Sequence, residues 1–256
     1  MYNHQRHEQL LQKLALNGSL KTEEMAAECG VSAETIRKDL IFLDQQGKLR
    51  RVRSGAIRAP MSRYDLPLPE REAFHRPEKG AIAHEACKLI QNRDTVFLDA
   101  SSTVMTMTEF FPDIEATVIT NAHHVVISLG DRENVDLICT GGDYEKRSRS
   151  YVGTLAEEAA RRFYMQWLFM GVDGLDAERG ASEVNRGQAR LKEQILNMAE
   201  HVCILADHSK LNRKSPFFFA RPRQIHTLIT DEGATPEDLA PFRDQNIRVL
   251  IASRPS

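Results

Sequence analysis

The chain has 256 residues, of which 41% are hydrophobic and 27% charged, and its formal net charge is −2. This length and composition predict one small domain and one larger domain with a full hydrophobic core. The four cysteines form no Cys-x-x-Cys pair and no apolar run approaches 18 residues, so we expect no metal site, disulfide framework, signal peptide or membrane span, and a cytoplasmic location.

The first 30 residues predict two short helices. An amphipathic run over residues 4–16 ends at Asn17-Gly18, a common signal for the end of a helix. We expect Thr22 to cap the second helix and Gly30 to end it. These are the first two helices of a predicted helix-turn-helix.

Residues 31–40, Val-Ser-Ala-Glu-Thr-Ile-Arg-Lys-Asp-Leu, predict the third helix, which would read DNA. Ser32 is a suitable N-cap, and Ile36, Leu40 and Leu43 recur at helical spacing as one apolar stripe. A short helix with a basic outer face fits the major groove. The residues expected to approach base edges are Thr35, Arg37 and Lys38.

Residues 46–56 alternate basic and apolar side chains and predict a two-stranded wing. Residues 37–63 contain eight basic and two acidic residues, a local balance of +6 that leaves −8 for the rest of the chain. A solvated, charged helical hairpin would explain the basic run, but the helix triplet and the wing favour DNA binding. The expected phosphate contacts are Ser32, Lys48, Arg50, Arg51 and Arg53.

Pro60, Pro67 and Pro69 disfavour helix, so we expect a linker over residues 59–78. Helical periodicity over 78–91 is followed by seven short apolar runs, at 95–98, 118–120, 135–139, 167–170, 202–205, 226–230 and 247–251. Their alternation with helical or polar segments predicts an α/β fold with a mostly parallel sheet. The expected domains are therefore 1–58 for DNA binding and 79–256 for ligand sensing and oligomerisation.

Small and polar residues follow several of these runs at their carboxyl ends, where open α/β sheets bind ligands. Residues 99–103, Asp-Ala-Ser-Ser-Thr, offer amides and hydroxyls to an anion at the start of a helix. Each such turn is also explained by a helix cap or a loop. Their recurrence at several strand ends nevertheless predicts one shared binding site.

Together these motifs resemble the DeoR family of bacterial transcriptional regulators over essentially the whole chain. Residues 35–40, Thr-Ile-Arg-Lys-Asp-Leu, match the family's Thr-Ile-Arg-Arg-Asp-Leu recognition helix. The usual His-Gly-Gly of the wing is Arg53-Ser54-Gly55 here, and residues 99–103 replace the usual Asp-x-Gly-Thr-Thr phosphate turn. The resemblance implies a C-terminal sensor domain related to ribose-5-phosphate isomerase, with a phosphorylated sugar as effector.

The resemblance also implies a sequence-specific regulator that represses a carbohydrate catabolic operon by binding a double-stranded operator. It would act as a homo-oligomer, a dimer or tetramer, with no cofactor and no membrane partner. Lys192 and Lys210 are candidate charge partners of the sugar phosphate. The expected effector-binding residues are Asp99, Ser101, Ser102, Thr103, Asn121, Gly141, Gly142, Asp173, Lys192, Asp207 and Lys210.

The alternative is a sugar-phosphate isomerase fused to a DNA-binding module. Residues 171–176 and Lys192-Glu193 resemble the isomerase segments that carry its catalytic acids. The isomerase also has a lysine and three glycines before that glutamate, whereas residues 183–192 contain no such loop. Losing the lysine would remove a charge that stabilises a developing oxyanion, so we expect binding without turnover and no catalytic residue. The family's usual glutamate here is Gln188.

Overall fold

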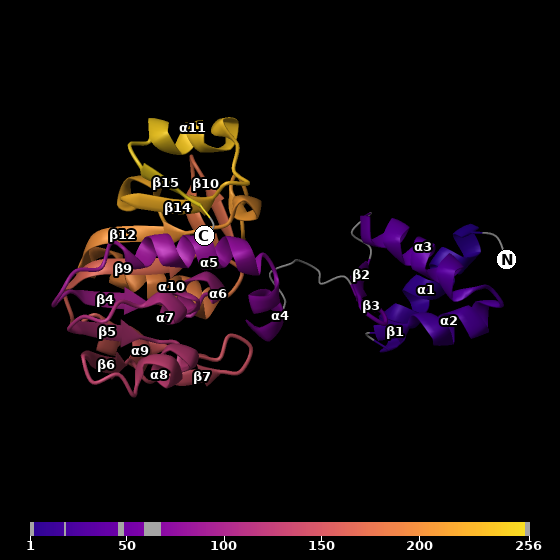
Figure 1. Ribbon diagram of the computed structural model, residues 1–256, viewed down its shortest axis with the longest axis horizontal. Helices are drawn as coiled ribbons and strands as arrows, with labels where there is room; N and C mark the ends of the chain where they lie inside the picture. Colours follow the sequence, from indigo (N-terminus) through magenta and orange to yellow (C-terminus); the bar gives the residue numbers. More distant parts are fainter. Residues whose placement is uncertain (1–2, 18, 46–48, 59–67, 254–256) are drawn as a thin grey trace. The chain divides into compact units, whose positions relative to one another are not determined.

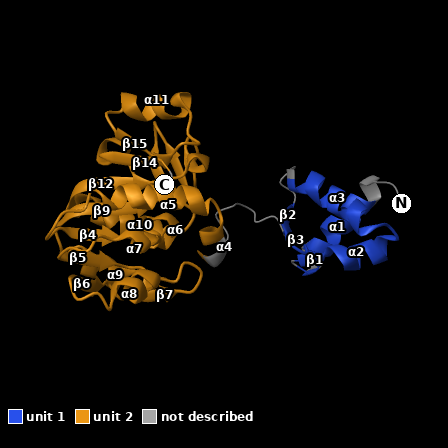
Figure 2. Ribbon diagram, viewed as in Figure 1, with its two compact units in different colours: residues 1–66 blue, residues 67–256 orange. Residues whose placement is uncertain are grey.

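The computed structural model describes residues 3–17, 19–45, 49–58 and 68–253. The chain divides into two compact units, residues 1–66 and 67–256, coloured separately in Figure 2. Each unit has its own hydrophobic core. Across the described residues, every helix is too short or too polar to cross a lipid bilayer.

The described part of the N-terminal unit contains the predicted helix-turn-helix (Figure 1). Its helices are α1 (Asn3–Asn17), α2 (Thr22–Cys29) and α3 (Ala33–Gln45). Gly30 ends α2 with a φ of 64°, as predicted. The expected cap at Thr22 is wrong by one residue, because Thr22 is the first helical residue and Lys21 occupies the N-cap without a side-chain hydrogen bond.

The predicted wing is present, with a third strand added. β2 (Leu49–Val52) and β3 (Gly55–Arg58) are antiparallel, and β1 (Ser19–Lys21) pairs with the other edge of β3. A Cβ atom on Gly55 would lie 1.9 Å from the carbonyl oxygen of Leu20, so this pairing requires a glycine. The wing therefore belongs to the same folded unit as the three helices.

The expected linker, residues 59–78, is wrong in its C-terminal part. Within it lie α4 (Leu68–Ala73) and the start of α5 (Arg76–Cys87). Pro69 and Pro77 each occupy the second position of a helix, where a missing N–H costs no intrahelical hydrogen bond. The prolines thus begin two helices instead of preventing them.

All seven predicted apolar runs form strands of one parallel sheet within residues 68–253 (Figure 1). In spatial order they are β15 (Arg248–Ala252), β14 (Thr227–Asp231), β12 (Ala199–Leu205), β9 (Met165–Gly171), β4 (Thr95–Leu98), β5 (Ala116–Thr120) and β6 (Val135–Cys139). The order reverses between β4 and β9. Ligands of open α/β sheets bind beside such a reversal, at the carboxyl ends of the strands.

Helices cover both faces of this sheet. Alternate residues of β4 and β9 enter different clusters, with Phe97 and Leu168 in one and Val96, Leu98 and Phe169 in the other. The remaining helices are α6 (Ser102–Met105), α7 (Met107–Phe110), α8 (His123–Leu129), α9 (Thr154–Ala160), α10 (Arg186–Ile195) and α11 (Pro236–Asp244). This doubly covered sheet is the α/β fold that the sequence predicts.

Within residues 68–253, two small antiparallel sheets lie outside the main sheet. One pairs β7 (Asp143–Glu145) with β8 (Ser150–Val152). The other joins β10 (Gly174–Asp176), β11 (Gly180–Glu183) and β13 (Phe217–Ala220). Because β10 and β11 directly follow β9, and β7 and β8 follow β6, both sheets continue from carboxyl ends of the main sheet.

Candidate functional site

The N-terminus of α3 has the predicted capping geometry. The hydroxyl oxygen of Ser32 accepts a hydrogen bond from the backbone N–H of Thr35 at 3.1 Å, and the two hydroxyl groups lie 2.9 Å apart. Ser32 is exposed and Thr35 is half-buried. Both hydroxyls are therefore at the surface of the helix end that would meet DNA.

The outer face of α3 carries the predicted basic side chains. Arg37 and Lys38 are exposed, and Arg37 forms an ion pair of 3.2 Å with Glu34 one turn earlier. Such an exposed pair contributes little free energy, so it does not prevent Arg37 from contacting DNA. Ile36 and Leu40 are buried on the opposite side, as predicted.

Asp39 lies within the same motif but points into the protein. Arg6 of α1 donates from Nε to one carboxylate oxygen of Asp39 at 2.5 Å and from Nη2 to the other at 3.1 Å. His7 Nε2 lies 2.9 Å from the second oxygen. Burial would raise the pKa of Asp39, but the hydrogen bonds from Arg6 and His7 outweigh it and lower that pKa.

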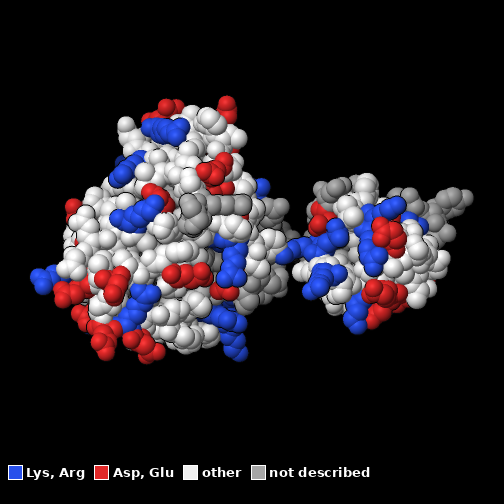
Figure 3. Space-filling view, in the orientation of Figure 1, with Lys and Arg blue, Asp and Glu red and all other residues white. Residues whose placement is uncertain are grey.

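The wing presents further basic residues. Arg51 and Arg53 are exposed and Arg50 is half-buried, whereas Lys48 lies outside the described residues. Figure 3 shows basic side chains gathered at the end of the N-terminal unit where β2 and β3 lie. The geometry thus brings the wing and α3 into one unit, and contact of these residues with DNA remains a prediction.

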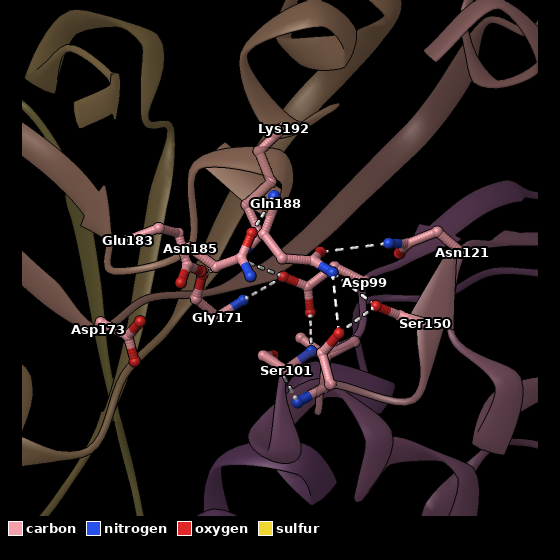
Figure 4. A network of polar contacts seen from close by, with 12 residues as sticks. Asp99, Ser101, Asn121, Ser150, Gly171, Asp173, Glu183, Asn185, Gln188 and Lys192 are labelled. Atoms are coloured by element: carbon pink, nitrogen blue, oxygen red, sulfur yellow. Dashed lines mark hydrogen bonds and ion pairs between the residues drawn. The ribbon is translucent and has the colours of Figure 1, made fainter. Parts of the chain in front are cut away.

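In the sensor unit, the turn after β4 is fixed by Asp99. One of its carboxylate oxygens accepts from Ser101 N–H at 2.8 Å, and the other from Gly171 N–H at 3.0 Å (Figure 4). A Cβ atom on Gly171 would lie 2.2 Å from Ser101 Oγ. The carboxylate and the glycine therefore hold the ends of β4 and β9 together at the reversal of strand order.

The predicted helix after this turn begins at Ser102. Ser101 is its N-cap, since its Oγ accepts from the N–H of Val104 at 3.3 Å. Ser102 and Thr103 lie in the first turn of α6 and are largely buried. Because α6 is a single turn, its dipole is small, and any anion bound there depends on local amides, hydroxyls and nearby cations.

Lys192, on α10, lies at the centre of the site, and its ammonium group contacts three protein groups. Its Nζ donates to the carbonyl oxygen of Gly171 at 2.8 Å and forms ion pairs with Asp99, also at 2.8 Å, and with Glu183. Burial opposes the charge, but the two carboxylates raise the pKa of Lys192. All three of its N–H donors thus have protein partners.

Glu183, on β11, is a site residue that sequence reasoning missed. Burial raises its pKa well above the ordinary value despite the neighbouring charge of Lys192. Burial also raises the pKa of Asp173, but a hydrogen bond with Glu183 and the charge of Lys210 outweigh it and lower that pKa. Asp173 also accepts from the N–H of Val184 at 3.0 Å. The pKa values of these two buried carboxyl groups are therefore displaced in opposite directions.

A second group of charges lies at the end of β12. Asp207 is buried, and its Oδ1 accepts from Ser209 N–H at 3.0 Å at the start of a 3-10 turn, His208–Lys210. The ammonium group of Lys210 is 4.0 Å from Asp173. Lys79 of α5 belongs to this group electrostatically, because Asp207 and Lys210 both act on its pKa.

Lys79 is the clearest cation that sequence reasoning missed. Burial, helped by the charges of Lys210 and Arg71 and opposed by that of Asp207, lowers the pKa of Lys79 from 10.5 to about 8. Its side chain donates to the backbone carbonyl of Arg71. From sequence, a lysine on a helix is expected to face solvent, so only the fold reveals that Lys79 is buried and close enough to Asp207 to feel its charge.

Asn121, at the end of β5, joins a buried amide and hydroxyl network (Figure 4). Its Nδ2 donates to the carbonyl of Tyr151 at 3.0 Å and to Gln188 Oε1 at 3.2 Å. Gln188 Nε2 in turn donates to Ser150 Oγ at 2.5 Å. Asn121 Oδ1 is buried and has no hydrogen-bond partner within the described residues, which leaves an acceptor available to a ligand.

The two predicted glycines after β6 serve different purposes. Gly142 has a φ of 113°, and a Cβ atom there would lie 2.6 Å from the carbonyl of Val152. Gly141 has a φ of 62° and open space around it. Gly142 is therefore required for packing of the β7–β8 hairpin, whereas Gly141 shapes the loop.

Neither His123 nor Glu193 contributes to the contacts described above. His123 packs against Tyr144 and Tyr151, with ring centroids 5.8 and 6.3 Å apart, and no metal-binding group of three His, Cys, Asp or Glu residues occurs in the described part of the chain. Glu193, the counterpart of an isomerase acid by resemblance, is exposed on α10. Glu183 and Asp173 are the buried acids here.

Comparisons with known proteins match both units. A DeoR-like helix-turn-helix domain model matches residues 6–60, and a DeoR C terminal sensor domain model matches residues 75–232. The chain is 33% identical over 245 residues to the uncharacterized HTH-type transcriptional regulator YulB of Bacillus subtilis, covering 96% of this chain and 95% of that protein. It is 32% identical over 250 residues to a putative aga operon transcriptional repressor of Escherichia coli O157:H7, covering 96% and 93%.

An L-fucose operon activator of Haemophilus influenzae is 30% identical over 241 residues and covers 94% of this chain and 96% of its own. Among solved structures, ribose 5-phosphate isomerase A of Methanocaldococcus jannaschii is similar with a TM-score of 0.38 and 16% identity, covering 52% of each chain. The sensor model alone spans more than half of the residues, and these relatives align along nearly the full length. The chain belongs to the DeoR family of transcriptional regulators.

Proposed function

We propose that this DNA-binding regulator represses a carbohydrate catabolic operon and that a phosphorylated sugar, bound at the carboxyl edge of the sensor sheet, changes its affinity for the operator. Relatives named for the aga and L-fucose operons support a role in sugar metabolism. One of these is a repressor and the other an activator. We expect this protein to repress its operon.

The observation that carries the effector assignment is the buried cation Lys79. Its lowered pKa means that the folded protein holds a desolvated amine beside a second cation, Lys210. A phosphate dianion would compensate both charges, and α5 packs against α6, which carries Ser102 and Thr103. We therefore assign the phosphate to Lys79, Lys210 and the hydroxyls of α6.

The rest of the site is suited to a polyhydroxylated ligand. Asp173 provides carboxylate oxygens, and Asn121 Oδ1 provides a buried acceptor that lacks a partner among the described residues. Lys192 was expected to pair with the phosphate. Because all its donors are used by Gly171, Asp99 and Glu183, we assign it the role of fixing the phosphate turn.

DNA recognition would use two groups of residues. Thr35, Arg37 and Lys38 are assigned to base edges, and Ser32 and the basic wing residues to phosphates. One winged module contacts too few base pairs for a genomic search, so we infer a dimer or tetramer assembled through the sensor unit, acting in the cytoplasm where the operator lies. Light scattering of the purified protein would give the oligomeric state.

The test is a thermal-shift screen of sugar phosphates, each paired with its unphosphorylated sugar. We expect at least one phosphate, and none of the free sugars, to raise the melting temperature and to alter operator binding in a gel shift. Lys79→Met and Ser102→Glu should abolish the shift. Lys88→Met is the matched control, because Lys88 is an exposed lysine at the other end of α5. Absence of any response in the wild type would refute the effector class.

A further inference from the structure

The short helix α4 contacts the elements to which we assign the effector phosphate, although it lies in the segment predicted as linker. Leu68 is fully buried in the sensor core, and its N–H donates to the carbonyl of Arg147 at 3.1 Å. The carbonyl of Arg71 accepts from the ammonium group of Lys79. α4 also packs against α6, beside the start of α5 (Figure 1). Its contacts thus include the two elements assigned to the phosphate.

The side chain of Arg71 lies among the charged groups of the site. Burial is the largest influence on the pKa of both Asp173 and Lys79, and the positive charge of Arg71 lowers both. The Nε atom of Arg71 is buried and has no hydrogen-bond partner within the described residues. A guanidinium whose charge acts on Lys79, with a buried N–H donor that lacks a partner among the described residues, is suited to an oxyanion, because its planar N–H groups match a phosphate.

α4 is also the first helix of the sensor unit that follows the DNA-binding unit in the chain. Residues 59–67 directly precede α4 in the chain and join it to the DNA-binding unit. A ligand that holds α4 therefore acts on the end of the segment that carries the DNA-binding unit. Effector and operator are then coupled to the extent that the effector prefers one arrangement of α4 over another.

We propose that Arg71 is an effector contact, binding the phosphate of the sugar from α4, and that this contact transmits occupancy of the site to the DNA-binding unit. The inference rests on the proposed function, since it places Arg71 at the same phosphate. It adds a residue outside the strand-end turns and assigns α4 as the coupling element. Lys79 links the two, because it contacts α4 through the Arg71 carbonyl.

The test compares Arg71→Gln with wild type in two assays. Loss of a charged hydrogen bond should weaken the binding of the sugar phosphate about ten- to a hundredfold. At saturating effector, the ratio of operator affinities with and without effector should move toward one, while operator affinity without effector stays at the wild-type value. Arg71→Lys, which keeps the charge but not the planar fork, should bind with intermediate affinity and show a ratio between those of wild type and Arg71→Gln.

Arg76→Gln is the matched control, since Arg76 is an exposed arginine on the first turn of α5. Wild-type effector affinity in Arg71→Gln would refute the contact. Weakened affinity with an unchanged ratio at saturation would refute the coupling. Far-UV circular dichroism of each ligand-free variant checks that the sensor is folded.

Inorganic phosphate, used as a second probe, separates this inference from the proposed function. If no sugar phosphate binds but inorganic phosphate stabilises wild type and not Arg71→Gln, the effector class is wrong and the Arg71 anion contact is supported. If sugar phosphates and inorganic phosphate bind both proteins equally, the Arg71 inference is wrong and the proposed function stands. If neither probe binds wild type, both are wrong.

Discussion

Arg6 and Asp39 form a buried, two-point ion pair that joins α1 to the recognition helix α3. Asp39 is the fifth residue of the Thr-Ile-Arg-Lys-Asp-Leu motif, and it is buried while its neighbours Arg37 and Lys38 are exposed. The motif therefore combines two tasks. Two of its basic residues face outward, and its acid fixes the helix that carries them.

Asp39→Asn should destabilise the N-terminal unit, because it removes the buried negative charge that Arg6 contacts at two points. Removing one partner of a buried pair costs roughly 3–5 kcal/mol, a large part of the stability of a small unit. In thermal unfolding of the full chain, the transition of the N-terminal unit should move to lower temperature. Operator binding should also be weaker than in wild type. Asp44→Asn, an exposed acid on the same helix, should leave both unchanged. Equal melting of Asp39→Asn and wild type would show that the pair contributes nothing.

The Arg6–Asp39 pair should also make the stability of the N-terminal unit sensitive to acid. Burial raises the pKa of Asp39, but Arg6 and His7 lower it below its ordinary value of 3.8. Since the folded pKa lies below the unfolded one, the contribution of the pair is complete above the unfolded pKa and disappears as pH falls through the folded pKa. Urea midpoints measured between about pH 6 and pH 2.5 should converge for wild type and Asp39→Asn. A constant difference over that range would contradict this.

Much of the architecture follows from sequence because it depends on local periodicity. The seven apolar runs predicted all the strands of the main sheet, and the capping signals at Ser32 and Gly30 placed the ends of two helices. The elements that were not predicted, β1 and α4, are short, and α4 begins beside prolines. β1 has three residues and one buried position, Leu20, which is too little for a period-two pattern. α4 starts beside prolines that also favour linkers.

The centre of the candidate site was only partly predictable, for a different reason. Asp99, Asn121, Asp173 and Asp207 follow strands, so topology alone brings them to one edge. Glu183, Lys79 and Arg71 lie on β11, α5 and α4, whose approach to that edge depends on tertiary packing. Lys192 lies beside Asp99 at the end of β4, and its three protein partners became visible only in the structure.

Lys192→Met distinguishes a structural lysine from a ligand contact. The substitution leaves the buried carboxyl groups of Asp99 and Glu183 without their cation, so we expect a loss of about 3 kcal/mol in sensor stability. Chemical denaturation followed by circular dichroism measures it, with Lys88→Met as the exposed control. Unchanged stability together with lost sugar-phosphate binding would restore the expected role of Lys192 as the charge partner of the phosphate.

Arg37 and Arg51 should respond differently to the identity of the DNA. Arg37→Ala should cost roughly 1–3 kcal/mol on the operator and relax sequence preference, because Arg37 is assigned to a base edge. Arg51→Ala should weaken operator and random DNA alike and flatten the salt dependence, as a phosphate contact does. Fluorescence anisotropy at several salt concentrations measures both. Equal losses for Arg37→Ala on operator and random DNA would exclude base reading.

Lys79 makes effector binding depend on pH in the alkaline range. With a pKa of about 8 in the ligand-free protein, Lys79 is mostly charged at pH 7 and mostly neutral at pH 9. A bound phosphate favours the charged amine and raises that pKa. Ionisation of Lys79 should therefore change the affinity for the sugar phosphate little below about pH 8. Above about pH 8 this affinity should fall by up to about tenfold per pH unit.

Isothermal titration of the sugar phosphate between about pH 7 and pH 9.5 tests this directly. Titrations near pH 8 in buffers of different ionisation enthalpy should show that the wild-type protein takes up a fraction of a proton on binding. Lys79 is the group that takes up this proton, because bound phosphate raises its pKa. Lys79→Met should bind weakly, with a dissociation constant that no longer rises with pH, and Lys88→Met should follow wild type. A wild-type dissociation constant that is flat to pH 9.5 would mean that the phosphate does not contact Lys79, and the anion would then have to be placed elsewhere along the sheet edge.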